Sequence, residues 1–252
     1  MTIFSPLKPR LITALALTLV AVLPACTMIG QQEYPLSDHS DGKRFFNRDG
    51  SDKGLADISR FLWESLWSEA EWPESVANPA VAAIPDRVTQ GIRTTYINHA
   101  TVLIQVSGLN ILTDPIWSER ASPVTFAGPK RIRPPGVAIE DLPEIDLILV
   151  SHNHYDHLDA KTIKLLLKKQ NINQPIFFVP LKLKETISKL GASNVIEHEW
   201  WQMSKHKNLE IYSVPVQQWS KRTFNDTNKT LWCGWVVKTN NFKYFFVGDT
   251  GY

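Results

Sequence analysis

The stretch Ser151-His152-Asn153-His154-Tyr155-Asp156-His157 decides how the rest of the sequence is interpreted, because it holds three of the chain's seven histidines within six consecutive residues, 152–157. An unbroken apolar run, residues 147–150, precedes the stretch and is typical of a fully buried strand. In an extended segment His152 and His154 point to the same side, so two imidazoles can share one metal ion. We expect Asp156 and His157 to enter the first turn of a following helix and to face a second ion. Imidazole nitrogens and a carboxylate suit zinc, with iron or manganese as substitutes.

A second element that could contribute to this site is Phe245-Phe246-Val247-Gly248-Asp249-Thr250-Gly251, a strand that ends in an aspartate flanked by glycine. Glycine lets the backbone approach a neighbour closely, and a carboxylate in that setting can bridge two cations. Gly-Asp turns are common, so Asp249 is a candidate ligand only in combination with the histidine cluster.

The order of the remaining predicted elements favours a layered domain of the mixed α/β (α+β) class. Alternating and continuous apolar runs predict an antiparallel meander followed by strands that alternate with helices. The predicted strands are 94–97, 101–106, 110–113, 146–150, 176–179, 194–196, 210–214, 232–238 and 244–247, and the predicted helices are 55–70, 159–169 and 182–190.

The N-terminus resembles an export signal. Lys8 and Arg10 are the only charges before an apolar run, residues 11–23, that is too short to span a bilayer. The run ends in Leu23-Pro24-Ala25-Cys26, which resembles the lipobox of bacterial lipoproteins, so we predict lipid attachment at Cys26. An ordinary cleaved signal is the alternative. Either reading places the protein outside the cytoplasm, in the periplasm or at the outer membrane.

These features divide the chain into a signal segment (1–25), an extended polar arm that wraps the domain (26–54) and one domain (55–252). If Cys26 is lipidated, Cys233 has no disulfide partner; a Cys26–Cys233 bridge is the alternative. The balance of 27 basic and 25 acidic residues gives no indication of nucleic-acid binding.

The histidine stretch and Asp249 together resemble the metallo-β-lactamase superfamily, whose signature is H-x-H-x-D-H after one strand and an aspartate after a later one. Further segments resemble the branch of N-acylphosphatidylethanolamine-hydrolysing phospholipase D. They are Ser37-Asp38-His39-Ser40-Asp41-Gly42, Arg44-Phe45-Phe46-Asn47, Asn98-His99-Ala100-Thr101-Val102-Leu103-Ile104, Leu112-Thr113-Asp114-Pro115-Ile116-Trp117 and Val214-Pro215-Val216-Gln217-Gln218-Trp219.

This resemblance implies an αββα sandwich with two zinc ions and a bridging hydroxide that attacks phosphorus and releases phosphatidic acid and an N-acylethanolamine. It implies that His152 and His154 hold the first zinc, that Asp156 and His157 hold the second, and that Asp249 bridges them. Asp156 is also the predicted catalytic residue. The expected partner is a phospholipid substrate or a membrane surface.

Two departures from the family pattern concern the ligands. The branch has a histidine directly before the tryptophan of the last quoted segment, whereas this chain has Gln218, and an amide oxygen is a weaker zinc ligand than an imidazole. Family members also continue past the aspartate to a further ligand histidine, so we expect an incomplete, C-terminally truncated sandwich. The alternative function is therefore a truncated, catalytically impaired, lipid-anchored scaffold or binding protein.

The other four histidines do not supply a convincing replacement for the missing ligands. We interpret His198 and His206 as surface residues, and His39 as part of the arm. His99 lies in a segment that resembles a family loop, and we interpret it as a structural hydrogen-bonding residue that could lie near the site.

Overall fold

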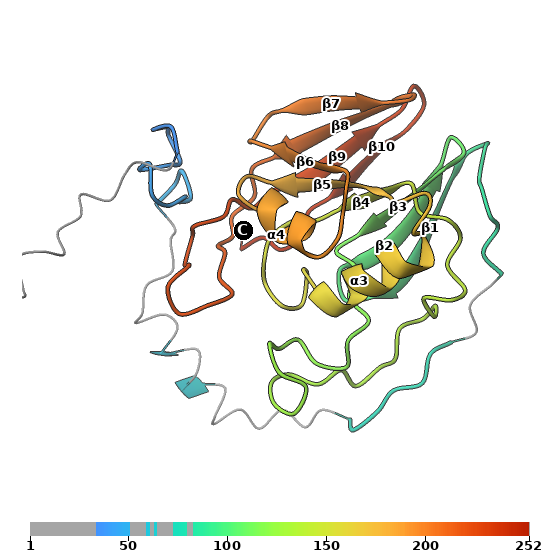
Figure 1. Ribbon diagram of the computed structural model, residues 1–252, viewed down its shortest axis with the longest axis horizontal. Helices are drawn as coiled ribbons and strands as arrows, with labels where there is room; N and C mark the ends of the chain where they lie inside the picture. The colour runs from blue at the N-terminus through green and yellow to red at the C-terminus, as the bar shows by residue number, and fades with distance from the viewer. Residues whose placement is uncertain (1–33, 51–58, 61–62, 65–72, 80–82, 252) are drawn as a thin grey trace, which may run out of the picture.

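The computed structural model describes residues 34–50, 59–60, 63–64, 73–79 and 83–251, and they form two sheets (Figure 1). The six-stranded sheet has the order β1-β2-β3-β4-β5-β6, and the four-stranded sheet has the order β10-β9-β8-β7. The first contains β1 (Ile92–Asn98), β2 (Thr101–Val106), β3 (Leu109–Thr113), β4 (Leu147–Leu149), β5 (Ile176–Pro180) and β6 (Val195–His198). The second contains β7 (Met203–His206), β8 (Leu209–Val214), β9 (Gly234–Lys238) and β10 (Lys243–Phe246).

The six-stranded sheet is mixed in direction, as the order of predicted elements indicated. Strands β1, β2 and β3 form the predicted antiparallel meander, and β3 to β6 pair in parallel. Helix α3 (Ala160–Lys169) connects β4 to β5, and α4 (Lys184–Lys189) connects β5 to β6. Parallel neighbours require such crossover connections. The carboxyl ends of β3 and β4 therefore meet at the same edge of the sheet.

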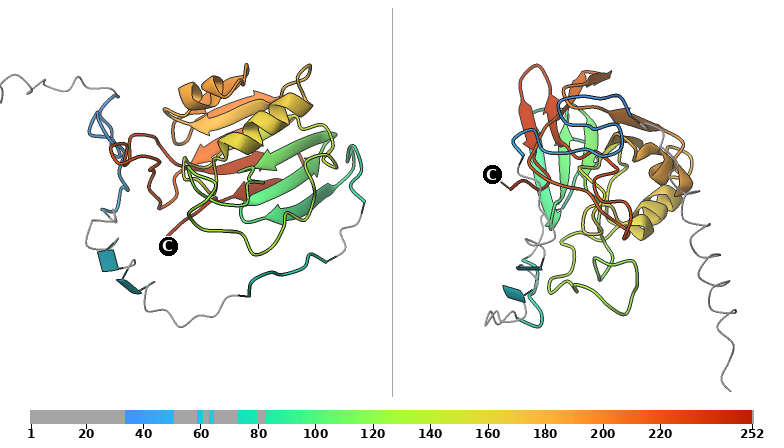
Figure 2. Two further views of the ribbon diagram at one scale, coloured as in Figure 1. Left: turned by 60° about the horizontal axis from the view of Figure 1, so that its bottom comes forward. Right: turned by 90° about the vertical axis from the view of Figure 1, so that its left-hand side faces the viewer.

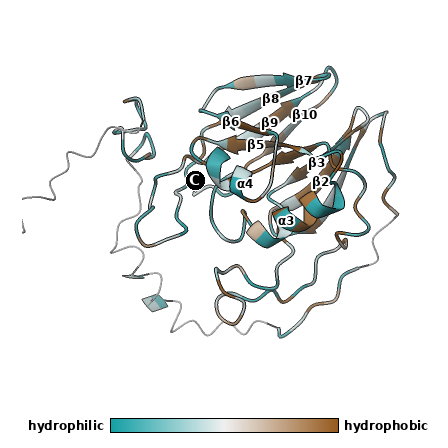
Figure 3. Ribbon diagram, viewed as in Figure 1, coloured by the Kyte–Doolittle hydropathy of each residue, from teal (hydrophilic) through white to brown (hydrophobic). Residues whose placement is uncertain are grey.

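The molecule has three layers, with α3 and α4 on one face of the six-stranded sheet and the four-stranded sheet on the other (Figures 1 and 2). Alternate side chains of the strands enter two separate cores. Ile104 and Ile111 pack towards Trp235 of the second sheet, whereas Ile148 packs in the cluster that contains Ile163 of α3. Inner strands such as β5 are accordingly among the most apolar parts of the fold, whereas the outer strand β7 is largely hydrophilic (Figure 3). Within the described part of the chain, this arrangement corresponds to the αββ layers of the predicted sandwich.

Most predicted elements are confirmed, but β7 was not predicted. Its residues Ser204-Lys205-His206 are polar, and it forms the outer strand of its sheet, where one side of the strand faces no neighbour among the described residues. The predicted helix 55–70 lies largely outside the described residues; the four of its residues that are described, 59–60 and 63–64, are helical. The signal segment 1–25 and Cys26 also lie outside them.

The described part of the arm, residues 34–50, is packed against the domain. Tyr34 and Phe45 are buried in the core between the sheets, and their rings stack with centroids 4.8 Å apart. The backbone N–H of Phe45 donates to the carbonyl oxygen of Asn228 at 2.8 Å. The arm is therefore polar in composition but contributes two aromatic side chains to the core. Of the helices that the structure describes, none is long and apolar enough to cross a membrane.

Candidate metal centre

The candidate site forms where three strands end. The stretch from Ser151 to His157 follows β4, Asp114 follows β3, and Asp249 follows β10. The parallel pairing of β3 with β4 places the first two segments side by side, and the close packing of the two sheets adds the third. The sheet topology thus brings together residues separated by up to 135 positions of sequence, from Asp114 to Asp249.

His152 and His154 face each other, as their two-residue spacing predicted. The Nε2 atom of His152 lies 2.8 Å from Nδ1 of His154, and Nδ1 of His152 lies 2.8 Å from the hydroxyl of Ser151. The Nε2 atom of His154 is buried and has no hydrogen-bond partner among the residues that the structure describes. Burial lowers the pKa of His154 to about 4 and places that of His152 well below its usual value, so both rings are neutral at pH 7. Neutral imidazoles with an unpartnered ring nitrogen are suited to binding a metal ion.

His157 forms the centre of a second group with His99, Asp156 and Asp249. Its Nε2 atom lies 3.2 Å from Nε2 of His99, 3.3 Å from a carboxylate oxygen of Asp249 and 3.7 Å from one of Asp156. His99 also approaches that oxygen of Asp156 at 3.2 Å. The sequence reasoning interpreted His99 as structural, but it is about half-exposed and its ring nitrogen points at the other ligand candidates. The signal that could have identified it is its place in a turn directly before β2.

The charges of this second group are those of a cation site. Burial alone would lower the pKa of His157, but hydrogen bonds to Asp114 and Asp249 raise it to about 10. Burial alone would raise the pKa of Asp156, but the hydrogen bond from His99 and the charge of His157 lower it to about 2. In the metal-free protein a proton on His157 therefore neutralises the surrounding carboxylates. Positive charge at this point is favourable, and a divalent cation would supply it.

Asp114 is the site residue that the sequence reasoning missed. It is fully buried, and its carboxylate accepts hydrogen bonds from the Ser151 amide at 2.7 Å and the Ser151 hydroxyl at 2.5 Å. The same carboxylate lies 2.7 Å from Nδ1 of His157. A carboxylate on one ring nitrogen orients an imidazole so that the other nitrogen can bind a metal. In the sequence, Asp114 stands out only as part of a segment that resembles the family. Its position directly after a buried strand is the feature that could have indicated a site residue.

Asp156 and His157 lie in a turn and not in the first turn of a helix, so that prediction was wrong. The backbone amides of His157 and Leu158 both donate to the carbonyl oxygen of His154. Helix α3 begins only at Ala160, because the Asp159 side chain accepts from the Lys161 amide as an N-cap. The tight turn brings Asp156 and His157 back towards the strand end, which a straight helical continuation would not do.

Gly248 allows Asp249 to reach this group. Its φ of +67° is in the left-handed region, and a Cβ atom there would lie 2.5 Å from Cβ of Ser151. No other residue fits against Ser151 at this point without a shift of the backbone. The glycine expected before Asp249 therefore has a specific steric role.

Gln218, the expected weak ligand, lies beside the site but is turned towards its own backbone. Its side-chain oxygen accepts the amide N–H of Trp219 at 3.1 Å. The Trp219 ring contacts His154 edge-on, with centroids 4.8 Å apart. Gln218 lines a hollow that also includes His154 and Asp249.

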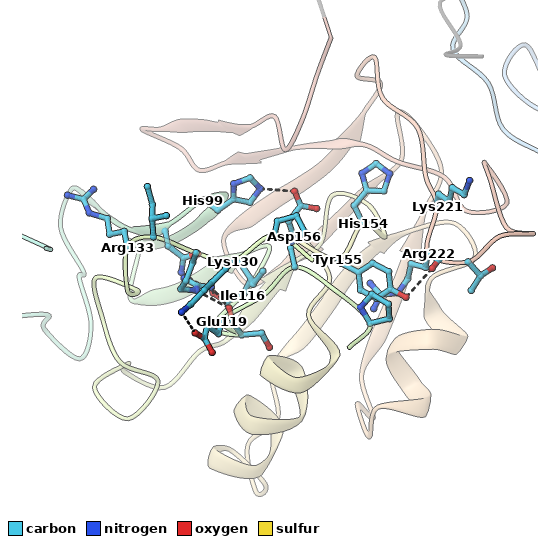
Figure 4. Close-up of a pocket in the computed structure, with 18 of the residues that line it drawn as sticks. His99, Ile116, Glu119, Lys130, Arg133, His154, Tyr155, Asp156, Lys221 and Arg222 are labelled. Atoms are coloured by element: carbon cyan, nitrogen blue, oxygen red, sulfur yellow. Dashed lines mark hydrogen bonds and ion pairs between the residues drawn. The ribbon is translucent and has the colours of Figure 1, made fainter. Parts of the chain in front are cut away.

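A cavity of about 1490 Å³ opens next to His154 and Asp156 (Figure 4). Its wall combines apolar and aromatic side chains with basic ones, including Tyr96, Ile116, Pro129, Trp219 and Phe224 together with Lys130, Arg133 and Lys221. Arg222 also lines it, and its guanidinium donates to the carbonyl oxygens of Asn153 and Leu158 and lies over the Tyr155 ring. Arg222 thereby connects the wall of the cavity to the turn at residues 154–157, referred to below as the metal-binding turn.

The remaining histidines lie away from this centre. His198 is buried between the rings of Phe178 and Trp235, so the prediction that it is a surface residue was wrong. Its last position in β6 points it into the core between the sheets. His206 is half-buried in β7, and His39 is buried in the arm. Cys233 is buried and has no disulfide partner within the described part of the chain.

Two histidine and carboxylate groups share His157 in the described structure: His99, Asp156 and His157 in one, and Asp114, His152 and His157 in the other. Together with the unpartnered nitrogen of His154, they provide a donor set that fits metal ions bound through nitrogen and carboxylate oxygen. The fold and this site are those of the family of metal-dependent hydrolases with the metallo-β-lactamase fold. A family model described as the beta-lactamase superfamily domain matches residues 109–252, and the chain belongs to that family.

Two of the curated relatives that this chain matches are named as N-acyl-phosphatidylethanolamine-hydrolyzing phospholipases D. The chain is 42% identical over 172 residues to the "N-acyl-phosphatidylethanolamine-hydrolyzing phospholipase D 1" of Caenorhabditis elegans, a match that covers 64% of this chain and 48% of the relative. It is 41% identical over 151 residues to the mitochondrial enzyme of that name in Saccharomyces cerevisiae, covering 58% of this chain and 31% of the relative. The chain thus spans about half the length, or less, of these relatives.

A solved structure supports the fold. The chain is similar to "a possible metal-dependent hydrolase" from Veillonella parvula, with a TM-score of 0.50, 18% identity and a match that covers 63% of each chain. The shared feature is the arrangement of sheets and helices, which agrees with the mixed α/β fold predicted from the sequence.

Proposed function

We propose that this chain is a zinc-dependent phosphodiesterase of the phospholipase D type that acts on N-acylphosphatidylethanolamine-like lipids. The observation that supports this proposal most directly is the cavity beside His154 and Asp156 (Figure 4). Its wall combines apolar and aromatic side chains with Arg133 and Lys221, and with Lys130, which is paired with Glu119 at 2.9 Å. An apolar wall suits acyl chains, and basic side chains attract a phosphodiester anion. The names of the two phospholipase D relatives agree with this substrate class.

In this proposal His152 and His154 would hold one zinc ion and Asp156 and His157 the other, with Asp249 and His99 as further donors. Bound zinc supplies a water of lowered pKa and a clamp for charge on the phosphoryl oxygens. The residues of the chain have three tasks. Asp114 and Ser151 keep His157 and His152 in orientation, Trp219 packs against His154 and shields its ring, and the basic rim draws the lipid phosphate towards the turn.

The test is hydrolysis of N-acylphosphatidylethanolamine in mixed vesicles by the zinc-loaded full chain, followed by mass spectrometry of the products. Release of an N-acylethanolamine together with phosphatidic acid is expected, and His154→Ala should abolish both the release and the zinc content. Stoichiometric zinc without release of either product would refute the lipid activity while leaving the metal site intact.

A second candidate, a binding protein that retains the scaffold without the chemistry, is favoured by one observation. Position 218 carries an amide side chain and therefore offers no imidazole to the site. The oxygen of that side chain accepts a hydrogen bond from the Trp219 amide N–H. This candidate predicts vesicle binding without turnover, and it predicts that Gln218→His alone does not create turnover. Measurable hydrolysis by either protein excludes it.

We also propose that the protein is exported and anchored by a lipid at Cys26. This rests on the charged, apolar and lipobox-like segments of residues 1–26. Incorporation of labelled palmitate that disappears in Cys26→Ser tests the anchor; equal labelling of the variant would contradict it.

A further inference from the structure

The arm and the candidate metal centre are connected through Asn47. This residue is buried, and its hydrogen-bond partner, Gln218, lies 171 positions away in the sequence. Its side-chain nitrogen donates to the carbonyl oxygen of Gln218 at 2.9 Å, and its side-chain oxygen accepts the amide N–H of Gln218 at 3.2 Å. One amide side chain thus satisfies both backbone groups of a single residue, which fixes the orientation of both peptide units at position 218.

The segment that Asn47 holds is also bound to the metal-binding turn. After Gln218, the Trp219 ring contacts His154, and the Lys221 amide donates to the Asn153 side chain at 2.8 Å. The segment 218–222 is therefore fastened to the arm at one end and to the turn at the other. A displacement at position 218 would move the Trp219 ring relative to His154.

The arm is itself held firmly enough to act as a support. The His39 ring stacks on Trp200 with centroids 4.3 Å apart, and its Nε2 atom lies 2.9 Å from the Glu199 carboxylate. Phe45, two residues before Asn47, is 1% exposed in the core. The contact between Asn47 and Gln218 is consequently a packed junction between the arm and the domain.

We infer that Asn47 is a positioning residue for the metal centre: it fixes the backbone at position 218 so that the Trp219 ring is placed against His154 and position 218 lines the hollow beside it. This inference rests on the metal site of the proposed function. Both hydrogen bonds from the Asn47 side chain to Gln218 reach the backbone of that residue, so this contact does not depend on which side chain occupies position 218. Position 218 lines the same hollow as His154 and Asp249, and a histidine there would offer a stronger metal ligand than the amide.

A double-mutant cycle on zinc affinity tests the inference without using activity. Zinc dissociation constants are measured by competition with a chromophoric chelator for the wild type, Asn47→Ala, Gln218→His and the double variant. We expect Gln218→His to tighten zinc binding about tenfold or more, and we expect Asn47→Ala to remove most of that gain. A matched control is Asn110→Ala, because Asn110 is equally buried and bonded to backbone groups at the other end of the sheet. It should leave the gain unchanged.

The outcomes separate this inference from the proposed function. An equal gain with and without Asn47 overturns the positioning role while the zinc site stands. If neither the folded wild type nor the folded Gln218→His variant binds zinc, both the positioning role of Asn47 and the proposed zinc site are overturned. If Asn47→Ala does not fold, Asn47→Asp provides the same test, because it preserves the side-chain volume but loses the donor to the Gln218 carbonyl oxygen.

Discussion

The two ends of strands β3 and β4 both hold buried polar side chains, but these side chains are partnered differently. At the amino ends, Asn110 donates through its side chain to two carbonyl oxygens, accepts from Gln105 and donates its backbone N–H to Asp146. At the carboxyl ends, imidazole nitrogens face one another at 2.8 and 3.2 Å, and Nε2 of His154 has no partner.

This difference separates a structural polar cluster from a functional one. Buried polar groups normally find hydrogen-bond partners, and Asn110 does. Gln105 Oε1 is also unpartnered at the amino ends, but no second acceptor faces it among the contacts of the described residues. At the carboxyl ends several imidazole nitrogens and carboxylate oxygens converge on His157, which is unfavourable unless a proton or a cation lies between them. The convergence of imidazole nitrogens and carboxylate oxygens on one point, and not their burial alone, therefore indicates the metal centre.

The largest expected effect is that of Asp114→Ala. Removing one partner of a buried ion pair leaves the other uncompensated, so we expect a loss of about 3–5 kcal/mol in the free energy of unfolding. Urea denaturation of the metal-free protein measures it. A denaturation midpoint equal to that of the wild type would show that Asp114 and His157 are not coupled.

Two glycines offer a steric comparison of the same two ends. Gly248 and Gly108 both have a positive φ, but an added Cβ would lie 2.5 Å from Ser151 in one case and 3.8 Å from Thr89 in the other. We expect Gly108→Ala to cost about 1–2 kcal/mol for the left-handed backbone alone. Gly248→Ala should cost at least about 1 kcal/mol more, because the core is overpacked. Equal losses in thermal or urea unfolding would contradict the close approach to Ser151.

His154→Ala should affect zinc binding far more than folding. Loss of a direct ligand should weaken zinc affinity by more than about 100-fold, the upper range for residues that only orient ligands. Because one ring nitrogen of His154 is unpartnered, the metal-free variant should lose less than about 1 kcal/mol of stability. Isothermal titration and urea denaturation measure the two quantities. Large destabilisation with unchanged affinity would reverse the assignment.

Asn110→Ala should show the opposite pattern, with the smallest effect on zinc affinity. We expect a loss of about 1–3 kcal/mol because its partners are left unsatisfied, with zinc affinity within about twofold of the wild type. The same two measurements apply. A change in zinc affinity at this distance would mean that the two ends of the strands are coupled.

The sequence allowed the prediction of most strands, α3 and the convergence of His152 with His154, because these depend on local periodicity and on a two-residue spacing. It placed Asp114 directly after a buried strand but could not show that Asp114 contacts His157, since that contact depends on the parallel pairing of β3 with β4. The same holds for His99, whose side chain reaches Asp156 across a turn. His198 was misassigned because the charged residues beside it indicated a surface segment, whereas its strand faces the core between the sheets.

Cys233 makes the centre accessible to a kinetic measurement. Its thiol is buried, burial raises its pKa well above the usual value, and its backbone N–H donates to the carbonyl oxygen of Ser151 at 3.0 Å. A thiol reagent can therefore react only when the region beneath the metal-binding turn opens. In a Cys26→Ser background, the labelling rate measures how often that region opens, and zinc should lower the rate by a factor that rises exponentially with the stability it adds.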